Sequence, residues 1–290
     1  MLLAMIFGVS GTSAKIKIVA STPDLADFAA IIGREKVEVS SIVRGTQNPH
    51  YIEVKPSYML RLKSADMFLI VGLQLEIWYR QIVDGSRNAK LLIVDCSKHI
   101  DKLEVPTFKV DASHGDVHPY GNPHYWLDPR NVGNIMQEIL DGLASISPAD
   151  LEYFKANRDA YLKKLDSKMA EWEEASEPFR GQKFITYHTS FSYFVSRFGF
   201  EVAGYVEPKP GIPPTPSHTA ELINLMRNAG IKVIGLEPFY DASVPNKIAE
   251  STGAQLVTLP TSVGGVPEAK DYIALIDYNI RTITRALAGK

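Results

Sequence analysis

At 290 residues and 32.1 kDa, the chain is longer than one typical hydrophobic core, which predicts two domains. Its composition, 45% hydrophobic and 22% charged, is ordinary for a globular protein, with no low-complexity segment and no long run of charge. A formal net charge of −2 argues against a nucleic acid or an acidic membrane surface as the partner.

The first segment in chain order is apolar: MLLAMIFGVSGTSA, residues 1–14. It ends in small residues that a signal peptidase could cut, although the usual positive charges do not precede it. Its 14 residues are too few to span a bilayer, which needs ~20 apolar residues. We predict a signal peptide over residues 1–14 and a periplasmic location; a buried strand is the alternative.

The cysteine content agrees with export. The single cysteine, Cys96, lies in the apolar run LLIVDCSKHI, so it cannot form an internal disulfide and is expected to be a small buried side chain. It also lies too far along the chain to be an N-terminal lipid anchor. We therefore expect a soluble periplasmic protein rather than a lipoprotein.

Short apolar runs alternate with amphipathic segments in residues 15–146, the predicted N-terminal lobe. This alternation predicts a mostly parallel sheet with helices on both faces. The predicted strands are 15–22, 37–45, 67–72 and 89–97, and the predicted helices are 23–33, 55–66 and 76–86.

A long polar helix is predicted over residues 147–180. Ser147 followed by Asp150 is a capping signal, and no proline occurs between Pro148 and Pro178. About 30 helical residues would reach ~45 Å, which suits a strut between two lobes.

The β-α alternation then restarts in residues 181–290, the predicted C-terminal lobe. Expected strands are 183–190, 200–207, 232–238 and 254–260, and expected helices are 191–199, 219–230, 244–253 and 269–289. The proline-rich stretch before residue 219 predicts a stiff loop that leads into a helix capped by Ser217, with His218 exposed. The fold class is thus α/β, with two lobes joined by one long rigid helix and a ligand crevice between them.

Three of the seven histidines are placed to share one metal ion. His50 and His124 each follow Asn-Pro, in TQNPHYIEVKPS and GNPHYWLDPRN, and His188 ends the predicted strand KFITYH. Each lies where a strand or turn brings a side chain to the crevice. Zinc accepts imidazole readily, and three histidines with an open fourth position are a known zinc arrangement.

The chain also resembles the solute-binding proteins of zinc and manganese ABC transporters. The resemblance runs in order over nearly the whole mature chain, through NPHYIEVKPS, ADMFLIVGLQLEIW, GNPHYWLDPRN, ITYHTSFSYFVSRFGF, GLEPFYDASVPNKIAESTGA and DYIALIDYNI. It implies two α/β lobes joined by a long helix, and a monomer that delivers metal to a membrane permease. It also implies that His50, His124 and His188 are the first three metal ligands.

The third ligand position bears on the choice of metal. The family varies there between His, typical of zinc binders, and Glu, typical of manganese binders. His188 therefore favours Zn²⁺ over Mn²⁺, in agreement with the preference of manganese for oxygen ligands.

One departure from the family concerns the fourth ligand. The family usually supplies an Asp in the loop after the last strand, where this chain reads TLPTSVGG without a carboxylate. Water, Glu237, Asp241 or Thr261 could close the coordination sphere. For Glu237 we favour a hydrogen-bonding role at the crevice floor.

Two further histidines, His114 and His118, lie in the short loop DASHGDVHPYGN, where many zinc-binding members have a His-rich loop. A solvated loop is weighed against weak auxiliary metal contact, and the solvated loop is preferred.

Two functions other than transport are weighed. A zinc hydrolase could also use three histidines and water, but no His-Glu-x-x-His motif is present. An adhesin is disfavoured by the missing anchor cysteine. We therefore predict a metal-binding protein without enzymatic activity.

Overall fold

Two four-stranded parallel sheets form the framework of the computed structural model, which describes residues 14–110, 115 and 117–289. The predicted signal peptide, residues 1–14, lies almost wholly outside the described residues, and His114 lies outside them as well. The first sheet has the order β2-β1-β3-β4 and the second β6-β5-β7-β8. Their strands are β1 Ile16–Ala20, β2 Val37–Ser41, β3 Met67–Ile70, β4 Leu92–Asp95, β5 Lys183–Thr186, β6 Glu201–Tyr205, β7 Val233–Leu236 and β8 Gln255–Thr258.

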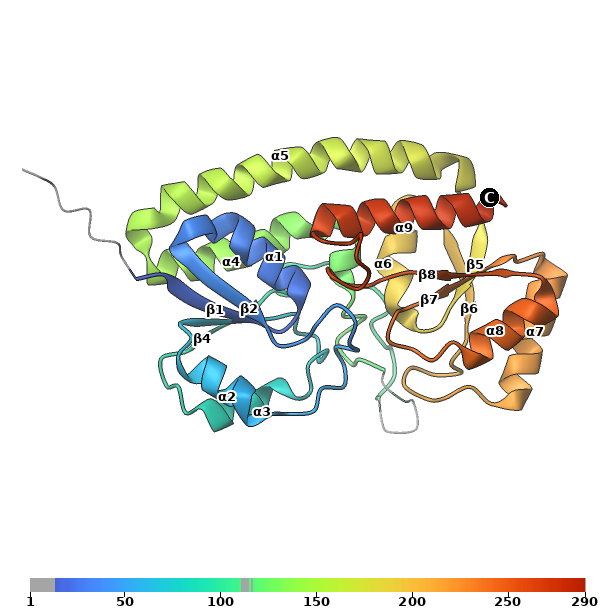
Figure 1. The fold of residues 1–290 in the computed structure, drawn as a ribbon, viewed down its shortest axis with the longest axis horizontal. Helices are drawn as coiled ribbons and strands as arrows, with labels where there is room; N and C mark the ends of the chain where they lie inside the picture. The colour runs from blue at the N-terminus through green and yellow to red at the C-terminus, as the bar shows by residue number, and fades with distance from the viewer. Residues whose placement is uncertain (1–13, 111–114, 116, 290) are drawn as a thin grey trace, which may run out of the picture.

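Helices cover both faces of each sheet, as predicted for parallel strands (Figure 1). In the first lobe α1 and α4 lie on one face, and α2 and α3 on the other. In the second lobe α6 and α9 lie opposite α7 and α8. The bounds are α1 Pro23–Gly33, α2 Pro56–Lys63, α3 Tyr79–Ser86, α4 Val132–Ile146, α6 Ser192–Phe198, α7 Pro216–Ala229, α8 Ser243–Thr252 and α9 Tyr272–Leu287.

Alternation along the strands assigns side chains to the two faces. In β1, Ile18 and Ala20 pack beneath α1 and α4, whereas Val19 between them joins the cluster under α2 and α3. In β5, Phe184 and Ile185 divide in the same way between the core and the cluster under α7 and α8. The central strands are therefore covered on both faces, which explains why runs such as β3, MFLI, and β7, VIGL, are apolar and fully buried.

The long helix α5, Leu151–Ser176, runs over both lobes and contacts α1 and α4 in the first and α6 and α9 in the second (Figure 1). Short 3-10 turns at 148–150 and 177–179 extend it at either end. Its buried side chains include Trp172, whose indole N–H donates to Asp277 of α9 at 2.6 Å. The predicted α/β fold with one long connecting helix is confirmed.

Three details of the sequence predictions need correction. Helix α4, with eight buried residues, was not among the expected elements. Helix α7 is capped by Thr215, whose hydroxyl accepts from the backbone N–H of His218 at 3.2 Å, and not by Ser217. His218 is half-buried rather than exposed, since its Nε2 lies 2.9 Å from the carbonyl oxygen of Tyr205.

The segment that follows β8 crosses back to the first lobe. Asp24 and Asp27 of α1 accept hydrogen bonds from the backbone N–H groups of Val263, at 3.0 Å, and Tyr272, at 2.9 Å. Trp126 donates its indole N–H to the carbonyl of Thr261 at 2.7 Å. The two lobes are thus joined by this segment as well as by α5. No helix among the described residues is long and apolar enough to cross a bilayer.

Candidate metal centre

The two Asn-Pro-His sequences form the same local turn. The side-chain oxygen of Asn48 accepts from the backbone N–H of His50 at 3.0 Å, and Asn122 accepts from that of His124 at 2.9 Å. Asparagine favours such turns because its amide oxygen reaches the backbone two residues on. The repeat predicted from sequence is therefore a repeated Asx turn that presents a histidine side chain.

Further contacts hold each turn in place. Trp78 donates its indole N–H to the carbonyl of Pro49 at 2.9 Å, which fixes the chain directly before His50. In the second turn the amide oxygen of Asn122 also lies 2.9 Å from Nδ1 of His124. When Nδ1 donates to this oxygen, Nε2 is left as the nitrogen that can bind a metal.

The third histidine comes from the second lobe. His188 follows β5, and its carbonyl accepts from the hydroxyl of Thr186 at 2.8 Å. Its Nδ1 is hydrogen-bonded to the carboxylate of Glu207, which follows β6. This bond directs Nε2 of His188 toward the crevice nitrogens in the same way as Asn122 does for His124.

The structure brings the three predicted histidines together. One ligand atom from each of His50, His124 and His188 lies within 4.8 Å of the others, and the Nε2 atoms of His50 and His124 are 3.2 Å apart. All three are buried, with 2–3% of their surface exposed. A divalent ion bound by three imidazoles and one further ligand matches the arrangement that zinc prefers.

The buried environment favours the neutral form of two of the three histidines, His50 and His124. Burial lowers the pKa of His50 and of His124 well below the ordinary value of about 6.5, and the other nearby imidazoles lower both further. Only neutral imidazole can bind a metal, so these side chains are ready to do so at neutral pH.

This electrostatic setting predicts an unusual pH profile for zinc affinity. Protons compete with zinc only once the metal-free histidines can be protonated, and the lowered pKa values shift that competition to more acidic pH. We expect the apparent affinity to be nearly constant from pH 8 to about pH 6.5, the titration point of free imidazole, and to fall only below it. Zinc competition titrations at fixed ionic strength test this; a decline centred at or above that pH would contradict it.

The predicted candidates for a fourth ligand lie in different surroundings. Glu237 is fully buried and accepts from the hydroxyl of Ser190 at 2.8 Å, while burial raises its pKa to about 7. Asp241 is exposed and accepts from the backbone N–H of Ser243 at 2.8 Å. Neither carboxylate joins the group of converging atoms formed by the described residues. Thr261 is buried next to Trp126, and the fourth ligand stays a prediction among these residues and water.

The remaining described histidines differ in their relation to the cluster. The ring of His118 stacks on that of His50, with centroids 5.1 Å apart, so the end of the His-containing loop lies beside the candidate centre. His99 lies elsewhere on the first lobe, where its Nδ1 is 2.6 Å from the carboxylate of Glu138.

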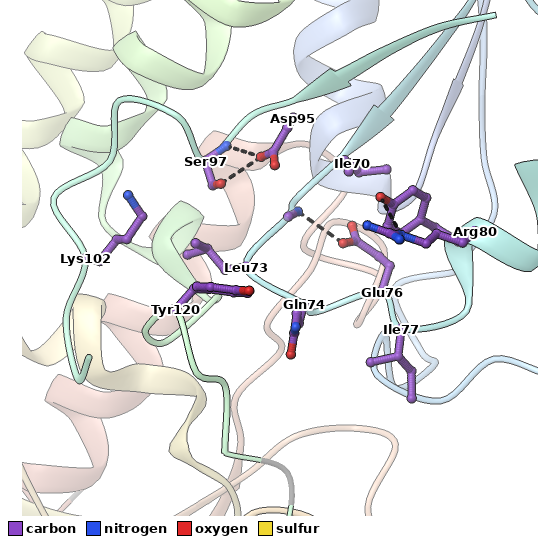
Figure 2. Close-up of a pocket in the computed structure, with 12 residues that line it drawn as sticks. Ile70, Leu73, Gln74, Glu76, Ile77, Arg80, Asp95, Ser97, Lys102 and Tyr120 are labelled. Carbon is purple, nitrogen blue, oxygen red and sulfur yellow. Dashed lines mark hydrogen bonds between the residues drawn. The ribbon is translucent and has the colours of Figure 1, made fainter. Parts of the chain in front are cut away.

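A separate pocket of about 630 Å³ lies at the carboxyl ends of β3 and β4, and none of the three clustered histidines lines it (Figure 2). Three successive residues, Gly72, Leu73 and Gln74, have positive φ angles there, a strained conformation for the two that are not glycine. The carboxylate of Glu76 holds this turn by accepting from the N–H groups of Val71, at 2.7 Å, and Gly72, at 3.1 Å.

Sequence reasoning missed the residues that orient the ligands. Asn48 and Asn122 were visible in the repeated Asn-Pro-His, and Asn is a common Asx-turn residue. Glu207 was not recognisable, because it meets His188 only through the pairing of β5 with β6.

Comparison with known proteins shows which protein family the chain resembles. A sequence profile described as "Zinc-uptake complex component A periplasmic" (ZnuA) matches residues 18–286. The manganese-binding lipoprotein MntA of Halalkalibacterium halodurans is 26% identical over 97% of this chain and 91% of its own length. The zinc-binding protein AdcA of Streptococcus pyogenes is 24% identical over 95% of this chain, which spans only 57% of AdcA.

The fold has a close counterpart among solved structures. The crystal structure of ZnuA superimposes with a TM-score of 0.82 and 24% sequence identity, covering 94% of this chain and 99% of the other. At that identity the likeness concerns the fold, two lobes under a long helix.

Proposed function

This chain belongs to the family of periplasmic zinc-uptake component A proteins, solute-binding proteins of zinc and manganese uptake systems, and on that premise we propose that it captures zinc. The ion would be held between the lobes by His50, His124 and His188 and passed to the permease of an ABC transporter. The convergence of three buried imidazoles from both lobes is the observation that carries this proposal.

The choice of zinc rests on the donor atoms. Similar proteins are named for zinc or for manganese, so family membership leaves both metals open. Manganese prefers oxygen ligands, whereas imidazole nitrogen suits zinc. The three-histidine group contains no carboxylate among the residues described, and we therefore propose zinc as the cargo and manganese as the weaker competitor.

The proposed role is transport rather than catalysis, at an extracytoplasmic location. The matched family is described as periplasmic, and the MntA relative is named a lipoprotein. Capture by buried ligands serves this role, because the ion is shielded from solvent until a partner receives it.

Calorimetric titration tests the proposal directly. After chelation and removal of the chelator, we expect zinc to bind with a stoichiometry near one per chain, as for one mononuclear site. Manganese should bind at the same site more weakly, and zinc should displace it. Two equally tight zinc sites would contradict a single centre, and tighter binding of manganese than zinc would contradict the assigned cargo.

A further inference from the structure

We infer that Glu207 is a specificity-determining residue of the metal site. Its carboxylate is hydrogen-bonded to Nδ1 of His188 and does not bind the ion itself, and in this position it favours zinc over manganese. This inference rests on the proposed function, since it concerns the same cluster. The three histidines alone do not lead to this inference, because all three offer the same kind of nitrogen donor. The groups hydrogen-bonded to the other ring nitrogen differ between His124 and His188.

The contact between His188 and Glu207 is enclosed by protein. Both side chains are 3% exposed, and Nδ1 of His188 is hydrogen-bonded to Oε1 of Glu207. The second oxygen, Oε2, accepts from the backbone N–H of Gly211 at 3.1 Å. Oε2 is therefore held as an acceptor, and Oε1 accepts as well when Nδ1 of His188 carries the proton.

The loop that carries Glu207 is built to hold it. Gly211 has φ of 75°, a conformation that glycine adopts without strain, and this directs its N–H back to the carboxylate. Pro208 and Pro210 lie between the two residues and restrict the backbone. The carboxylate is thus fixed by both its oxygens and by a stiff loop.

The group that is hydrogen-bonded to Nδ1 of His124 is neutral, unlike a carboxylate. Its Nδ1 meets the amide oxygen of Asn122 at 2.9 Å, a neutral acceptor that can orient the ring but adds no negative charge. Glu237, the other buried carboxylate considered above, takes its hydrogen bond from the Ser190 hydroxyl and not from an imidazole. Glu207 is therefore a carboxylate that acts through the ring of a ligand, in contrast to Asn122 and Glu237.

A carboxylate in this position strengthens the imidazole as a metal ligand but does not replace its nitrogen by an oxygen ligand. When Nε2 of His188 binds an ion, Nδ1 keeps its proton and donates it to Glu207, which makes the imidazole a stronger donor. The buried negative charge also offsets part of the charge of either dication, so this contribution does not distinguish zinc from manganese. The ion nevertheless gains no oxygen ligand, so zinc benefits from the stronger nitrogen while manganese still lacks the oxygen that it prefers.

Glu207→Gln tests the charge with little change of shape. The amide oxygen can still accept from Nδ1, so ring orientation is kept. The negative charge is lost, and the amide NH₂ group can no longer accept from the N–H of Gly211. We expect zinc affinity to fall about 10- to 100-fold, the usual effect of losing such a supporting group. Manganese affinity should fall much less, so that the zinc-to-manganese ratio of dissociation constants narrows. Competition titrations with ZnCl₂ and MnCl₂ on the full chain measure both.

Glu138→Gln is the matched control. Glu138 is also a buried glutamate hydrogen-bonded to Nδ1 of a histidine, His99, but that pair is not part of the cluster. This variant should leave both metal affinities unchanged. Glu207→Met, a second neutral variant of similar volume, should narrow the ratio as Glu207→Gln does, so the test does not depend on one substitution folding.

Thermal melting of the metal-free proteins measures how far the substitution destabilises the fold, apart from its effect on metal affinity. We expect the melting temperature of metal-free Glu207→Gln to fall by no more than about 10 °C, because only the N–H of Gly211 loses its acceptor, at about 1–3 kcal/mol. An unchanged zinc-to-manganese ratio would overturn the inference, and equal losses of both affinities would assign Glu207 a structural role. A parent that binds neither ion would instead overturn the proposed function, on which the inference rests.

Discussion

Replacing His188 by alanine is expected to weaken zinc binding by about a hundredfold to a thousandfold. Structural zinc sites bind with roughly 10–16 kcal/mol shared among their ligands, so one ligand accounts for ~3–4 kcal/mol, and each 1.4 kcal/mol is tenfold in affinity. His188 is the ligand that the second lobe contributes, so its loss also removes the link that the ion makes between lobes. Competition titration with a chelator of known zinc affinity measures the effect.

His50→Ala and His124→Ala are expected to have effects of the same size, because all three imidazoles converge on one point. His99→Ala is the matched control: it removes a histidine that lies outside the cluster, and its zinc affinity should equal that of the parent. If His188→Ala bound zinc as tightly as the parent, the ion would not lie between the lobes.

Replacing Trp126 by alanine is expected to lower the free energy of unfolding by about 3–5 kcal/mol and the melting temperature by roughly 10 °C. Trp126 is 1% exposed and packs against the ring of His124, with centroids 5.4 Å apart. Its indole N–H donates to Thr261, and its carbonyl accepts from the hydroxyl of Tyr272 at 2.5 Å. The alanine variant would therefore leave a cavity and break a contact between the first lobe and the returning segment. Melting of the chelator-treated protein measures this without the contribution of bound metal.

Trp126→Phe separates packing from hydrogen bonding. It keeps most of the buried ring but leaves the Thr261 carbonyl without its donor, which should cost about 1–3 kcal/mol. We expect its melting temperature to lie between those of the parent and the alanine variant. Equal melting temperatures for the parent and Trp126→Ala would mean that this residue does not join the two parts of the core.

The strands and most helices could be predicted because the physics that forms them is local. Runs such as MFLI in β3 are apolar because both faces are covered, and helix α1 begins at the predicted Pro23 and ends at Gly33. Helix α4 was missed although its buried Ile135, Met136, Ile139 and Leu143 have helical spacing. This apolar spacing directly after the histidine motif is itself a helix signal.

The candidate site was only partly predictable, for a different reason. Spacing along the chain could suggest that His50, His124 and His188 lie near strand ends, but their convergence depends on how two lobes are placed. The resemblance to a known family, rather than hydrophobic periodicity, indicated that these three histidines bind one ion. Asn122 acts on His124 through a local turn, whereas Glu207 acts through tertiary geometry. A carboxylate 19 residues from His188 becomes its neighbour only when β6 pairs with β5.

The return of the chain to the first lobe after β8 has a consequence for how the protein folds. Helix α9 contributes Tyr272, whose ring lies 4.9 Å from that of Phe28 in α1, so elements from nearly opposite ends of the sequence pack together. Such contacts close a very long loop and give the fold a high contact order, which slows folding. During synthesis, α1 and α5 are complete long before residues 272–287 exist. The parts of α1 and α5 that α9 will cover stay exposed until then, and such exposed apolar surface on a nascent chain favours binding by chaperones.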